Sequence, residues 1–291
     1  MPIENYKPQK PFLVGIDSDG CVFDTMELKH KECFIPAFIR HYKLQSVSNY
    51  ARQAAEFVNL YSKSRSSNRF VALIEQLDWL RRRPEVIERG TYIPKPEGLI
   101  NWVAQATRLG NPALSEAVEA TGDPDLAQAL RWSEDVNSAM ATMVRNVPPF
   151  PSVQKCLQRF DEAADMLVVS AAPIKALESE WQEHGVARFV RGMYGQETST
   201  KQETLSLASH YEPNHTLMIG DAPGDYKAAL ANKCLFFPIN PGSEERSWQR
   251  LHDEGIDRFL FGTFSGEYQK QLLTMYEKYL PSEPPWDVVE V

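Results

Sequence analysis

The sequence predicts an α/β fold: a doubly wound, Rossmann-like parallel sheet with an all-α cap domain inserted after the first strand. Three observations lead to this fold class. A short apolar run, residues 12–16, stops at polar Asp17, as a buried strand does. Residues 25–147 show helical periodicity with almost no strand-like runs. From residue 148 onward, short apolar runs alternate with helical stretches, which is typical of a parallel sheet.

The elements follow from periodicity and from the turn residues at their ends. In the cap, helices are predicted over residues 26–39, 50–61, 70–80, 99–109, 126–132 and 136–144. In the core, strands are predicted over residues 12–16, 166–170, 189–194, 216–220 and 235–239, and helices over 153–164, 174–184, 200–211 and 225–232. Residues 244–280 are predicted to be mostly helical, and residues 281–291 to be frayed.

We expect the insertion to divide the chain into two domains. Residues 1–24 and 148–291 would form the α/β core domain, and residues 25–147 the helical cap domain. The proline-rich stretch 147–151 interrupts the helical pattern and indicates a linker. Ligands of open parallel sheets bind at the carboxyl ends of the strands, so a cap inserted there can act as a lid.

Charge and cysteine content narrow the class of protein. The 291 residues carry 31 Lys and Arg against 39 Asp and Glu, and this net charge of −8 argues against a nucleic-acid partner. The charge is uneven, because residues 25–147 carry +2 and the remainder −10. No apolar run of about 18 residues and no signal-peptide pattern is present, so no membrane partner is expected. Four cysteines without a Cys-x-x-Cys pair predict reduced thiols in a cytoplasmic protein.

Polar residues follow three of the predicted strands. Asp17 and Asp19 follow the first, Ser170 closes a second, and Asp221 and Asp225 follow a third. Because parallel strands bring these ends to one edge of the sheet, the carboxylates would repel one another unless a cation joined them. Oxygen ligands favour a hard ion such as Mg²⁺, whose coordination is completed by water and by substrate phosphate. The sequence therefore predicts a Mg²⁺ site at this edge.

Each of these pieces also has a purely structural explanation. The Asp-x-Asp-Gly sequence at Asp17 is a common turn after a strand, and Ser170 often stands where a serine caps the next helix. The run from Gly220 to Asp225 could be a turn followed by a helix cap, and a helical lysine such as Lys201 is usually solvated. The order of all four pieces, at the strand ends of an α/β pattern, favours the functional interpretation.

These residues resemble the motifs of the haloacid-dehalogenase-like (HAD) superfamily. The segment Asp17-Ser-Asp-Gly-Cys-Val-Phe-Asp24 is similar to its first motif, Asp-x-Asp-Gly-x-x-x-Asp. Ser170 is similar to the second motif, Lys201 to the third, and Gly220-Asp-Ala-Pro-Gly-Asp225 to the fourth. A helical cap between the first two motifs resembles the phosphoglycolate phosphatase and β-phosphoglucomutase branch. Here the cap is enlarged, because Asp17 and Ser170 stand 153 residues apart.

The resemblance implies a role for each motif residue. Asp17 would attack phosphorus and form an aspartyl-phosphate, and Asp19 would protonate the leaving oxygen and then activate water. Ser170 would donate a hydrogen bond to a phosphoryl oxygen, with Ala171 beside it also contacting the substrate. Lys201 would neutralise the developing charge and keep Asp17 ionised.

The same resemblance implies the Mg²⁺ ligands. These would be the carboxylate of Asp17, the backbone carbonyl of Asp19, and Asp221. Asp225 would act as a ligand through water or would orient Lys201.

The implied activity is hydrolysis of a small phosphorylated metabolite by a Mg²⁺-dependent phosphatase. The acid at Asp19 disfavours cleavage of carbon–halogen and carbon–phosphorus bonds, because the superfamily members with those activities lack an acid at that position. A phosphoglucomutase-like phosphoryl transferase remains an alternative, and a non-catalytic phosphate-binding protein is a further one. The oligomeric state is left open.

Recognition of the leaving group would fall to the cap. The run of residues 62–69 is its most polar and basic stretch, and Lys63, Arg65, Asn68 and Arg69 are candidate substrate-binding residues. The alternative is a solvated loop whose serines and asparagine cap the helix that begins near Phe70.

Overall fold

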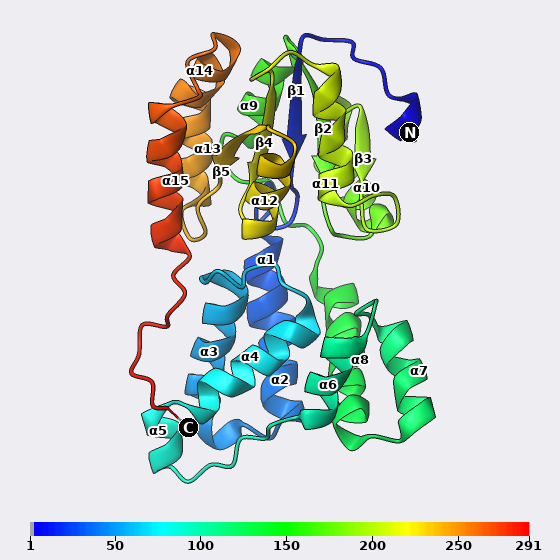
Figure 1. The fold of residues 1–291 in the computed structure, drawn as a ribbon, viewed down its shortest axis with the longest axis vertical. Helices are drawn as coiled ribbons and strands as arrows, with labels where there is room; N and C mark the ends of the chain where they lie inside the picture. The colour runs from blue at the N-terminus through cyan, green and yellow to red at the C-terminus, as the bar shows by residue number, and fades with distance from the viewer. Residues whose placement is uncertain (1–2, 291) are drawn as a thin grey trace. The chain divides into compact units, whose positions relative to one another are not determined.

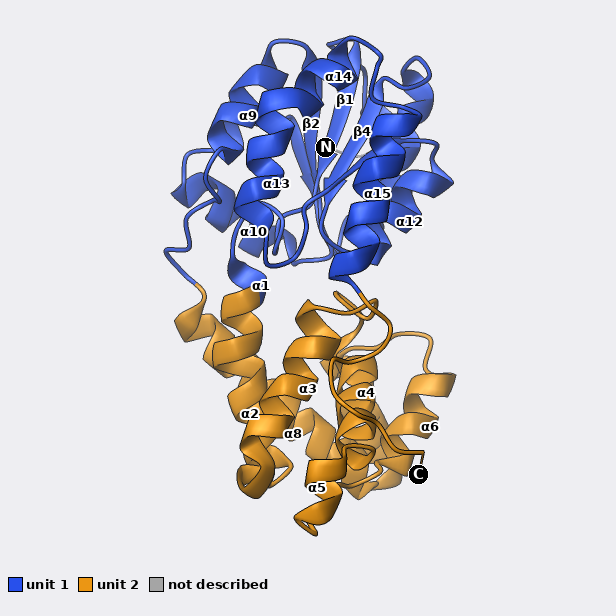
Figure 2. Ribbon diagram, turned by 90° about the vertical axis from the view of Figure 1, so that its left-hand side faces the viewer, with its two compact units in different colours: residues 1–26, 145–280 blue, residues 27–144, 281–291 orange. Residues whose placement is uncertain are grey.

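The computed structural model describes residues 3–290, which form two compact units (Figure 2). The core unit runs up to Met26 and from Arg145 to Leu280, and the helical unit comprises Glu27–Val144 and the residues from Pro281 onward. The place of the C-terminal residues differs from the prediction, which made residues 281–291 a frayed end of the core domain. Residues 281–290 instead lie on the helical unit, where Trp286 and Val288 pack against its hydrophobic core. Residue 291 lies outside the described residues.

A five-stranded sheet forms the centre of the core unit (Figure 1). Its strands are β1 (Phe12–Ile16), β2 (Ala164–Val169), β3 (Gly192–Tyr194), β4 (Thr216–Gly220) and β5 (Leu235–Pro238). They lie in the order β3-β2-β1-β4-β5, and each neighbouring pair is parallel. This arrangement confirms the predicted α/β fold class with a parallel sheet. β1 lies in the middle of the sheet. The carboxyl ends of its two parallel neighbours, β2 and β4, therefore lie on either side of the carboxyl end of β1.

Seven α-helices accompany the sheet in the described core unit, counted from α9 onward. They are α9 (Val153–Asp161), α10 (Ile174–Glu183), α11 (Lys201–Leu205), α12 (Pro223–Ala231), α13 (Glu244–Arg250), α14 (Ile256–Leu260) and α15 (Glu267–Tyr279). A π-helical turn, Leu251–Gly255, joins α13 to α14. The helix predicted over 200–211 is divided, because a 3₁₀ turn over Ser206–His210 follows the short α11.

The helices cover both faces of the sheet because side chains alternate along each strand. In β1, Val14 and Ile16 point to the face packed by α9, α10 and α13. Leu13 points to the opposite face, which is packed by residues of α11, α12 and α15. All three side chains are fully buried. The doubly covered sheet explains why its strands are continuous apolar runs rather than alternating ones.

The helical unit contains eight α-helices within the described residues. They are α1 (Thr25–Leu28), which begins in the core unit, α2 (Ile35–His41), α3 (Ser48–Leu60), α4 (Arg69–Arg81), α5 (Pro84–Glu88), α6 (Glu97–Gln105), α7 (Asn111–Thr121) and α8 (Pro124–Met143). The single helix expected over 26–39 is interrupted by a π-helical segment, Lys29–Phe34. The two helices expected over 126–132 and 136–144 form one continuous helix, α8. The sequence pattern predicted no helix at α7. Leu114 is the one buried residue of this helix, so its sequence shows no apolar stripe.

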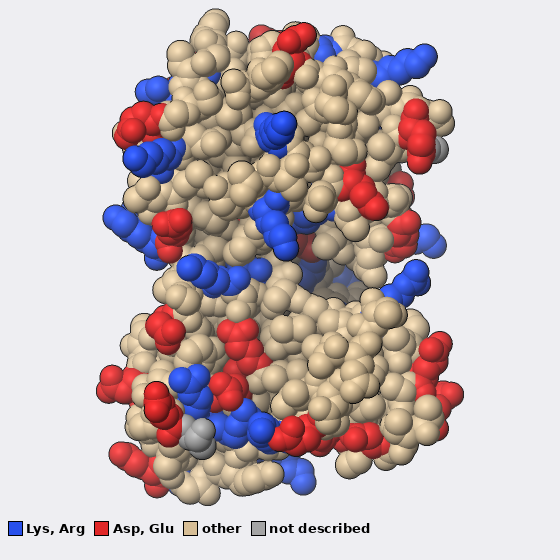
Figure 3. Space-filling view, in the orientation of Figure 1, with Lys and Arg blue, Asp and Glu red and all other residues tan. Residues whose placement is uncertain are grey.

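Charged side chains of both signs are interspersed on the face shown in Figure 3, and neither sign forms a continuous surface there. All four cysteines are buried and outside any disulfide. Among the described residues, none of the helices has the length and apolar character needed to cross a bilayer.

Candidate active site at the carboxyl edge of the sheet

The motif residues lie in the loops that follow three adjacent strands. Asp17 comes directly after β1, Ser170 directly after β2, and Asp221 directly after β4. Since β1 pairs with both β2 and β4, these three residues leave the sheet side by side. The carboxyl edge of the sheet therefore collects the first, second and fourth motifs, as the strand ends predicted.

Two glycines allow the backbone to make these loops. Gly20, which closes the first motif turn, has a φ of 74°, a conformation that favours glycine. Gly220 precedes Asp221, and a β-carbon there would lie 2.5 Å from side-chain atoms of Asp225. Both positions need glycine because of the backbone and the close approach of the motif side chain.

Lys201 connects two of the carboxylates. Its Nζ lies 2.9 Å from Oδ2 of Asp17 and 2.5 Å from Oδ1 of Asp225. Thr200 caps the helix that starts at Lys201 through a reciprocal capping box with Glu203, so the position of the lysine backbone is fixed by its own helix end. The ammonium group is therefore held between the first and fourth motifs.

Asp225 also organises the fourth motif. Its Oδ2 accepts hydrogen bonds from the backbone N–H groups of Asp221 and Ala222, at 3.2 and 3.0 Å. One carboxylate oxygen thus shapes the loop and caps α12, while the other pairs with Lys201. Of the two roles that the sequence left open for Asp225, orientation of Lys201 is the one visible as a direct contact.

The carboxylates of Asp17, Asp221 and Asp225 form a compact buried cluster. One oxygen from each lies within 4.8 Å of the others. Lys201 contacts only Oδ2 of Asp17, and the buried Oδ1 has no hydrogen-bond partner within the described chain. A buried carboxylate oxygen without a partner costs free energy unless a cation or a donor reaches it. Three buried carboxylates beside one ammonium therefore fit a hard divalent cation.

Burial and charge act in opposite directions on the titration of this cluster. Burial lowers the pKa of Lys201, but the carboxylates of Asp17 and Asp225 outweigh it and raise that pKa well above its ordinary value. Burial raises the pKa of Asp225 to about 6, despite the nearby Lys201 ammonium, and the charge of Asp17 adds to the rise. The cluster therefore holds an excess of negative charge that favours cation binding.

The remaining motif residues surround the cluster. The carboxylate of Asp19 accepts a hydrogen bond from the Thr25 hydroxyl at 2.5 Å, and its carboxylate oxygens are not part of the cluster. Oγ of Ser170 accepts a hydrogen bond from the backbone N–H of Ala172 at 3.2 Å, which fixes the hydroxyl at the start of the loop. Ala171, between them, is exposed.

Three aromatic side chains that the sequence did not single out support the motif loops. The indole N–H of Trp181 donates to the Ser18 hydroxyl at 2.9 Å, and that of Trp248 donates to the carbonyl of Cys21 at 2.7 Å. The Tyr276 hydroxyl donates to the carbonyl of Asp221 at 3.0 Å. They stand in α10, α13 and α15, and none of them belongs to a motif.

The four candidate substrate-binding residues of the helical unit have different surroundings. Asn68 caps α4 by accepting from the N–H of Phe70, and Arg65 is buried, with its guanidinium bonded to a backbone carbonyl. Arg69 donates to Ser133. Lys63 is exposed. For Asn68 this arrangement matches the capping alternative. Among the four residues, Lys63 is the one that is exposed to solvent.

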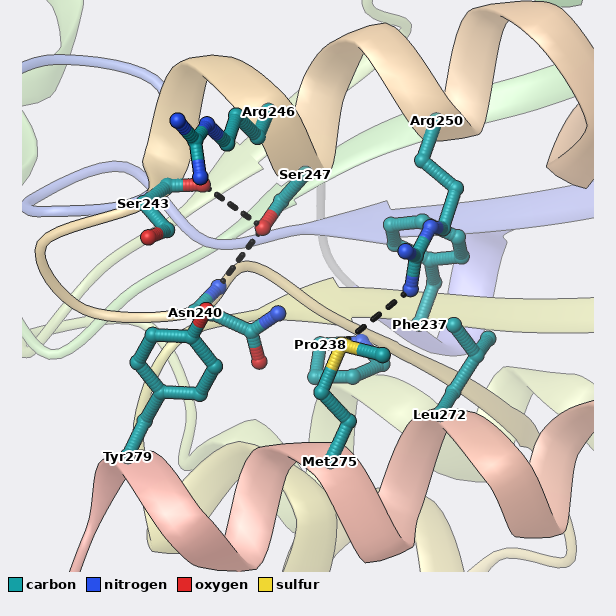
Figure 4. Close-up of a pocket in the computed structure, with 10 residues that line it drawn as sticks. All are labelled: Phe237, Pro238, Asn240, Ser243, Arg246, Ser247, Arg250, Leu272, Met275 and Tyr279. Atoms are coloured by element: carbon teal, nitrogen blue, oxygen red, sulfur yellow. Dashed lines mark hydrogen bonds between the residues drawn. The ribbon is translucent and has the colours of Figure 1, made fainter.

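A separate cavity of about 130 Å³ lies between α13 and α15, beside the end of β5 (Figure 4). Ser247 organises one wall, because its Oγ donates to the Ser243 carbonyl and accepts from the N–H of Asn240. Arg250, also in α13, donates to the sulfur of Met275 in α15 on the opposite wall. None of the residues that line this cavity belongs to the four motifs.

Comparison with known proteins gives matches to solved structures. No family model and no curated protein matches the sequence. The chain is similar to a haloacid dehalogenase-like hydrolase from Streptococcus pneumoniae, with 12% identity over 82% of this chain and 90% of that one and a TM-score of 0.42. It is also similar to a predicted phosphoglycolate phosphatase from Haemophilus somnus (15% identity, 79% and 86% covered, TM-score 0.39) and to L-2-haloacid dehalogenase from Xanthobacter autotrophicus (15%, 91% and 86%, 0.38).

The fold agrees with the α/β architecture that the sequence predicted. A parallel sheet carries a helical insertion after its first strand, and Asp17, Lys201, Asp221 and Asp225 come together at its carboxyl edge.

Proposed function

We propose that the protein is a Mg²⁺-dependent phosphomonoester hydrolase that acts through an aspartyl-phosphate. The observation that carries this proposal is the buried cluster of Asp17, Asp221 and Asp225 with Lys201 bridging two of its members. A carboxylate is a weak nucleophile, so it needs to be ionised, fixed in place and supported by positive charge. In support of this role, the Lys201 ammonium contacts Asp17 and holds its carboxylate in place.

Asp17 would carry out the first displacement. Lys201 holds one of its oxygens, which orients the carboxylate. An oxygen of Asp17 forms a bond to phosphorus while the bond from phosphorus to the ester oxygen breaks. The leaving oxygen takes the proton of Asp19, and the products of this half-reaction are the alcohol and phosphorylated Asp17.

Asp19 would then serve as the base for the second displacement. Its carboxylate accepts the proton of a water molecule as the water oxygen attacks phosphorus, and the bond from phosphorus to Asp17 breaks. Phosphate leaves and both acids return to their starting states. The hydrogen bond from Thr25 orients the Asp19 carboxyl for both proton transfers.

Ser170 and Lys201 would stabilise the negative charge of the transferring group. Ser170 lies in a loop and Lys201 at the start of α11, and each is fixed by local hydrogen bonds, so little reorganisation is needed when charge develops. Ala171, exposed beside Ser170, would contact the phosphoryl group through its backbone.

Asp17, Asp221 and the backbone carbonyl of Asp19 would hold Mg²⁺, with Asp225 supporting them through Lys201 or through water. When bound, the ion supplies positive charge that offsets the repulsion between phosphate and carboxylates. The substrate would be a small phosphorylated metabolite, with Lys63 the leading candidate in the helical unit for contact with its leaving group.

Turnover of p-nitrophenyl phosphate tests the proposal. We expect hydrolysis that requires Mg²⁺ and falls by roughly 10³-fold or more in Asp17→Asn. Glu178→Gln, an exposed carboxylate of α10, is the matched control and retains activity. Failure of the wild type to hydrolyse this ester and a panel of phosphorylated metabolites would overturn the proposal. Exchange between sugar-phosphate isomers that requires a bisphosphate primer would identify the transferase alternative instead.

A further inference from the structure

The cavity between α13 and α15 combines a buried amide, a positive charge and an apolar side in a volume suited to a small molecule. That volume is about 130 Å³. Engineered cavities of about 150 Å³ bind ligands the size of benzene, so this cavity admits a ligand of about six non-hydrogen atoms. All of its lining residues belong to the core unit, so the cavity lies within one compact unit.

Asn240 supplies the buried amide. The residue follows β5 and is 6% exposed, and Figure 4 shows its side chain extending into the space between the two helices. Its backbone is held on both sides, because its N–H donates to Oγ of Ser247 at 3.0 Å and its carbonyl accepts from the N–H of Ser243 at 2.9 Å. Its side-chain oxygen, Oδ1, is buried and has no hydrogen-bond partner within the described chain.

A buried amide oxygen without a partner indicates what an occupant of the cavity has to offer. Nearly all buried polar groups in proteins are hydrogen-bonded, because an unpaired one has lost its contact with water and gained nothing in return. An amide oxygen only accepts hydrogen bonds. The occupant therefore needs an O–H or N–H group that reaches Oδ1 of Asn240.

Arg250 supplies the positive charge. Its Nη1 donates to Sδ of Met275 at 3.3 Å. A thioether sulfur is a weak acceptor, so the guanidinium keeps donors for a stronger one. Its Nε lies 3.6 Å from Oε1 of Glu254, but both side chains of this pair are more than a third exposed, so the pair offsets the charge only weakly. The planar guanidinium matches a carboxylate, which can accept two parallel hydrogen bonds from it.

Apolar side chains form another part of the lining. Phe237, Pro238 and Leu272 line the cavity and are buried. Carbon atoms of an occupant gain by contact with these side chains, whereas an inorganic anion such as phosphate does not. Arg246, which is exposed, adds a second positive charge to the lining. The cavity is therefore complementary to an anion that carries a short carbon chain.

We propose that this cavity is a binding site for a short organic acid: a carboxylate with a hydroxyl or amino group on the adjacent carbon. The carboxylate binds the guanidinium of Arg250, and the hydroxyl or amino group donates to Oδ1 of Asn240. The carbon chain packs against Leu272. The site is separate from the four motifs, and the inference does not depend on the reaction catalysed.

Isothermal titration calorimetry of the full chain, with a chelator present, tests the assignment. L-Lactate and L-alanine carry the donor as a hydroxyl and as an ammonium group, and propionate has the same carboxylate without a donor. We expect lactate or alanine to bind with a millimolar or lower Kd, and propionate to bind about fivefold more weakly, as the loss of one hydrogen bond predicts. Equal affinity for all three acids, or no binding of any at tens of millimolar, would overturn the proposal.

Two variants show where the acid binds. Asn240→Leu removes the acceptor and keeps a side chain of similar size, so it is expected to abolish the preference for lactate or alanine over propionate. Arg250→Gln is expected to weaken the binding of every acid by about tenfold or more, since it removes a charge-assisted hydrogen bond. Lys270→Gln, exposed on α15 and outside the lining, removes the same charge and is expected to leave the affinities unchanged. Undiminished binding in Arg250→Gln would contradict the proposed site.

Inorganic phosphate separates an organic-acid site from a general oxyanion site. It is expected to bind more weakly than the preferred acid, because it has no carbon atoms to place against Leu272. Tighter binding of phosphate, lost in Arg250→Gln, would overturn the assignment to an organic acid. The Arg250 side chain is 38% exposed, so Arg250→Gln is expected to fold and keeps the test decisive even if Asn240→Leu does not fold.

Discussion

The hydroxyl of Tyr276 donates a hydrogen bond to the backbone carbonyl of Asp221, 3.0 Å away, so the last helix of the core unit supports the loop that carries a predicted metal ligand. Both groups are buried. The bond fixes the backbone from which the Asp221 carboxylate extends toward Asp17. A side chain 55 residues farther along the chain thus takes part in shaping the acidic site.

Tyr276→Phe removes this bond and keeps the ring in place. We expect the Mg²⁺ concentration for half-maximal activity to rise roughly 3- to 10-fold, because one buried hydrogen bond contributes about 1 kcal/mol and supporting residues tune metal affinity by similar factors. The maximal rate at saturating Mg²⁺ changes little. Tyr279→Phe, on the same helix, is the control. An unchanged Mg²⁺ requirement in Tyr276→Phe would show that the bond does not position Asp221.

Removal of the Lys201 ammonium leaves Asp17 and Asp225 as buried carboxylates without their cation. We expect Lys201→Met to lower the free energy of unfolding at pH 7 by about 3 kcal/mol in the presence of a chelator, the cost of breaking a buried ion pair on one side. Mg²⁺ is expected to recover part of this loss, because it binds the folded state. Urea unfolding with and without Mg²⁺ measures both. The exposed Lys227→Met serves as control, and equal stability of the two variants would refute this role of Lys201.

The polar run 62–69 can either bind substrate or cap α4, and the two roles predict different effects of mutation. Asn68→Ala is expected to lower the free energy of unfolding by about 1 kcal/mol through loss of the helix cap, with KM unchanged. Lys63→Ala is expected to raise KM for an anionic substrate while stability stays the same, since the side chain is exposed. Thermal unfolding and steady-state kinetics separate the effects. A raised KM in Asn68→Ala would place the asparagine in contact with substrate.

The stability of the protein is expected to depend on pH through Asp135 of the helical unit. Burial alone would raise the pKa of Asp135, but hydrogen bonds from Arg40 and His41 outweigh it and hold that pKa below its usual value. The folded state therefore favours the ionised carboxylate. The stabilisation is present above the unfolded-state pKa of about 3.9 and is lost as the pH falls through the folded-state value.

Asp135→Asn makes that dependence measurable. The variant is expected to be less stable than the wild type at pH 7 by about 0.2–1 kcal/mol, since the carboxylate is partly solvated, and the difference shrinks toward pH 3. Urea unfolding of both proteins across this range gives the comparison. A difference that stays constant with pH would show that the ionised form of Asp135 is not what stabilises the fold.

The sequence predicted the core well because its signals are local. Buried strands such as Phe12–Ile16 end at polar residues, and parallel pairing leaves little freedom in where those ends meet. The placement of Asp17 and Asp221 on neighbouring loops follows from that pairing. The predicted start of a helix at residue 200 also lies close to the observed one, because Thr200 caps the helix that begins at Lys201.

Long-range side-chain contacts could not be predicted in the same way. Trp286 was assigned to a frayed end, because a proline-rich segment has no helical or strand periodicity of its own and is ordered by Phe57 and Arg83 of the helical unit. Tyr276 lies in a segment that was predicted only to be mostly helical, and the folded chain shows its hydroxyl at Asp221. Two helices were predicted where α8 is continuous. The residues between them, 133–135, are polar, but Ser133 is buried and hydrogen-bonded within the helical unit.

Covalent labelling of Asp17 tests the central claim most directly. Mg²⁺ and radiolabelled acetyl phosphate are mixed with Asp19→Asn, which lacks the base for the second displacement, and the reaction is quenched in acid and digested. The account predicts label on the peptide that contains Asp17, released by hydroxylamine as an acyl phosphate is, and none when Asp17→Asn is added to the same chain. Turnover by the wild type with no label on that peptide, or with label on another residue, would contradict it.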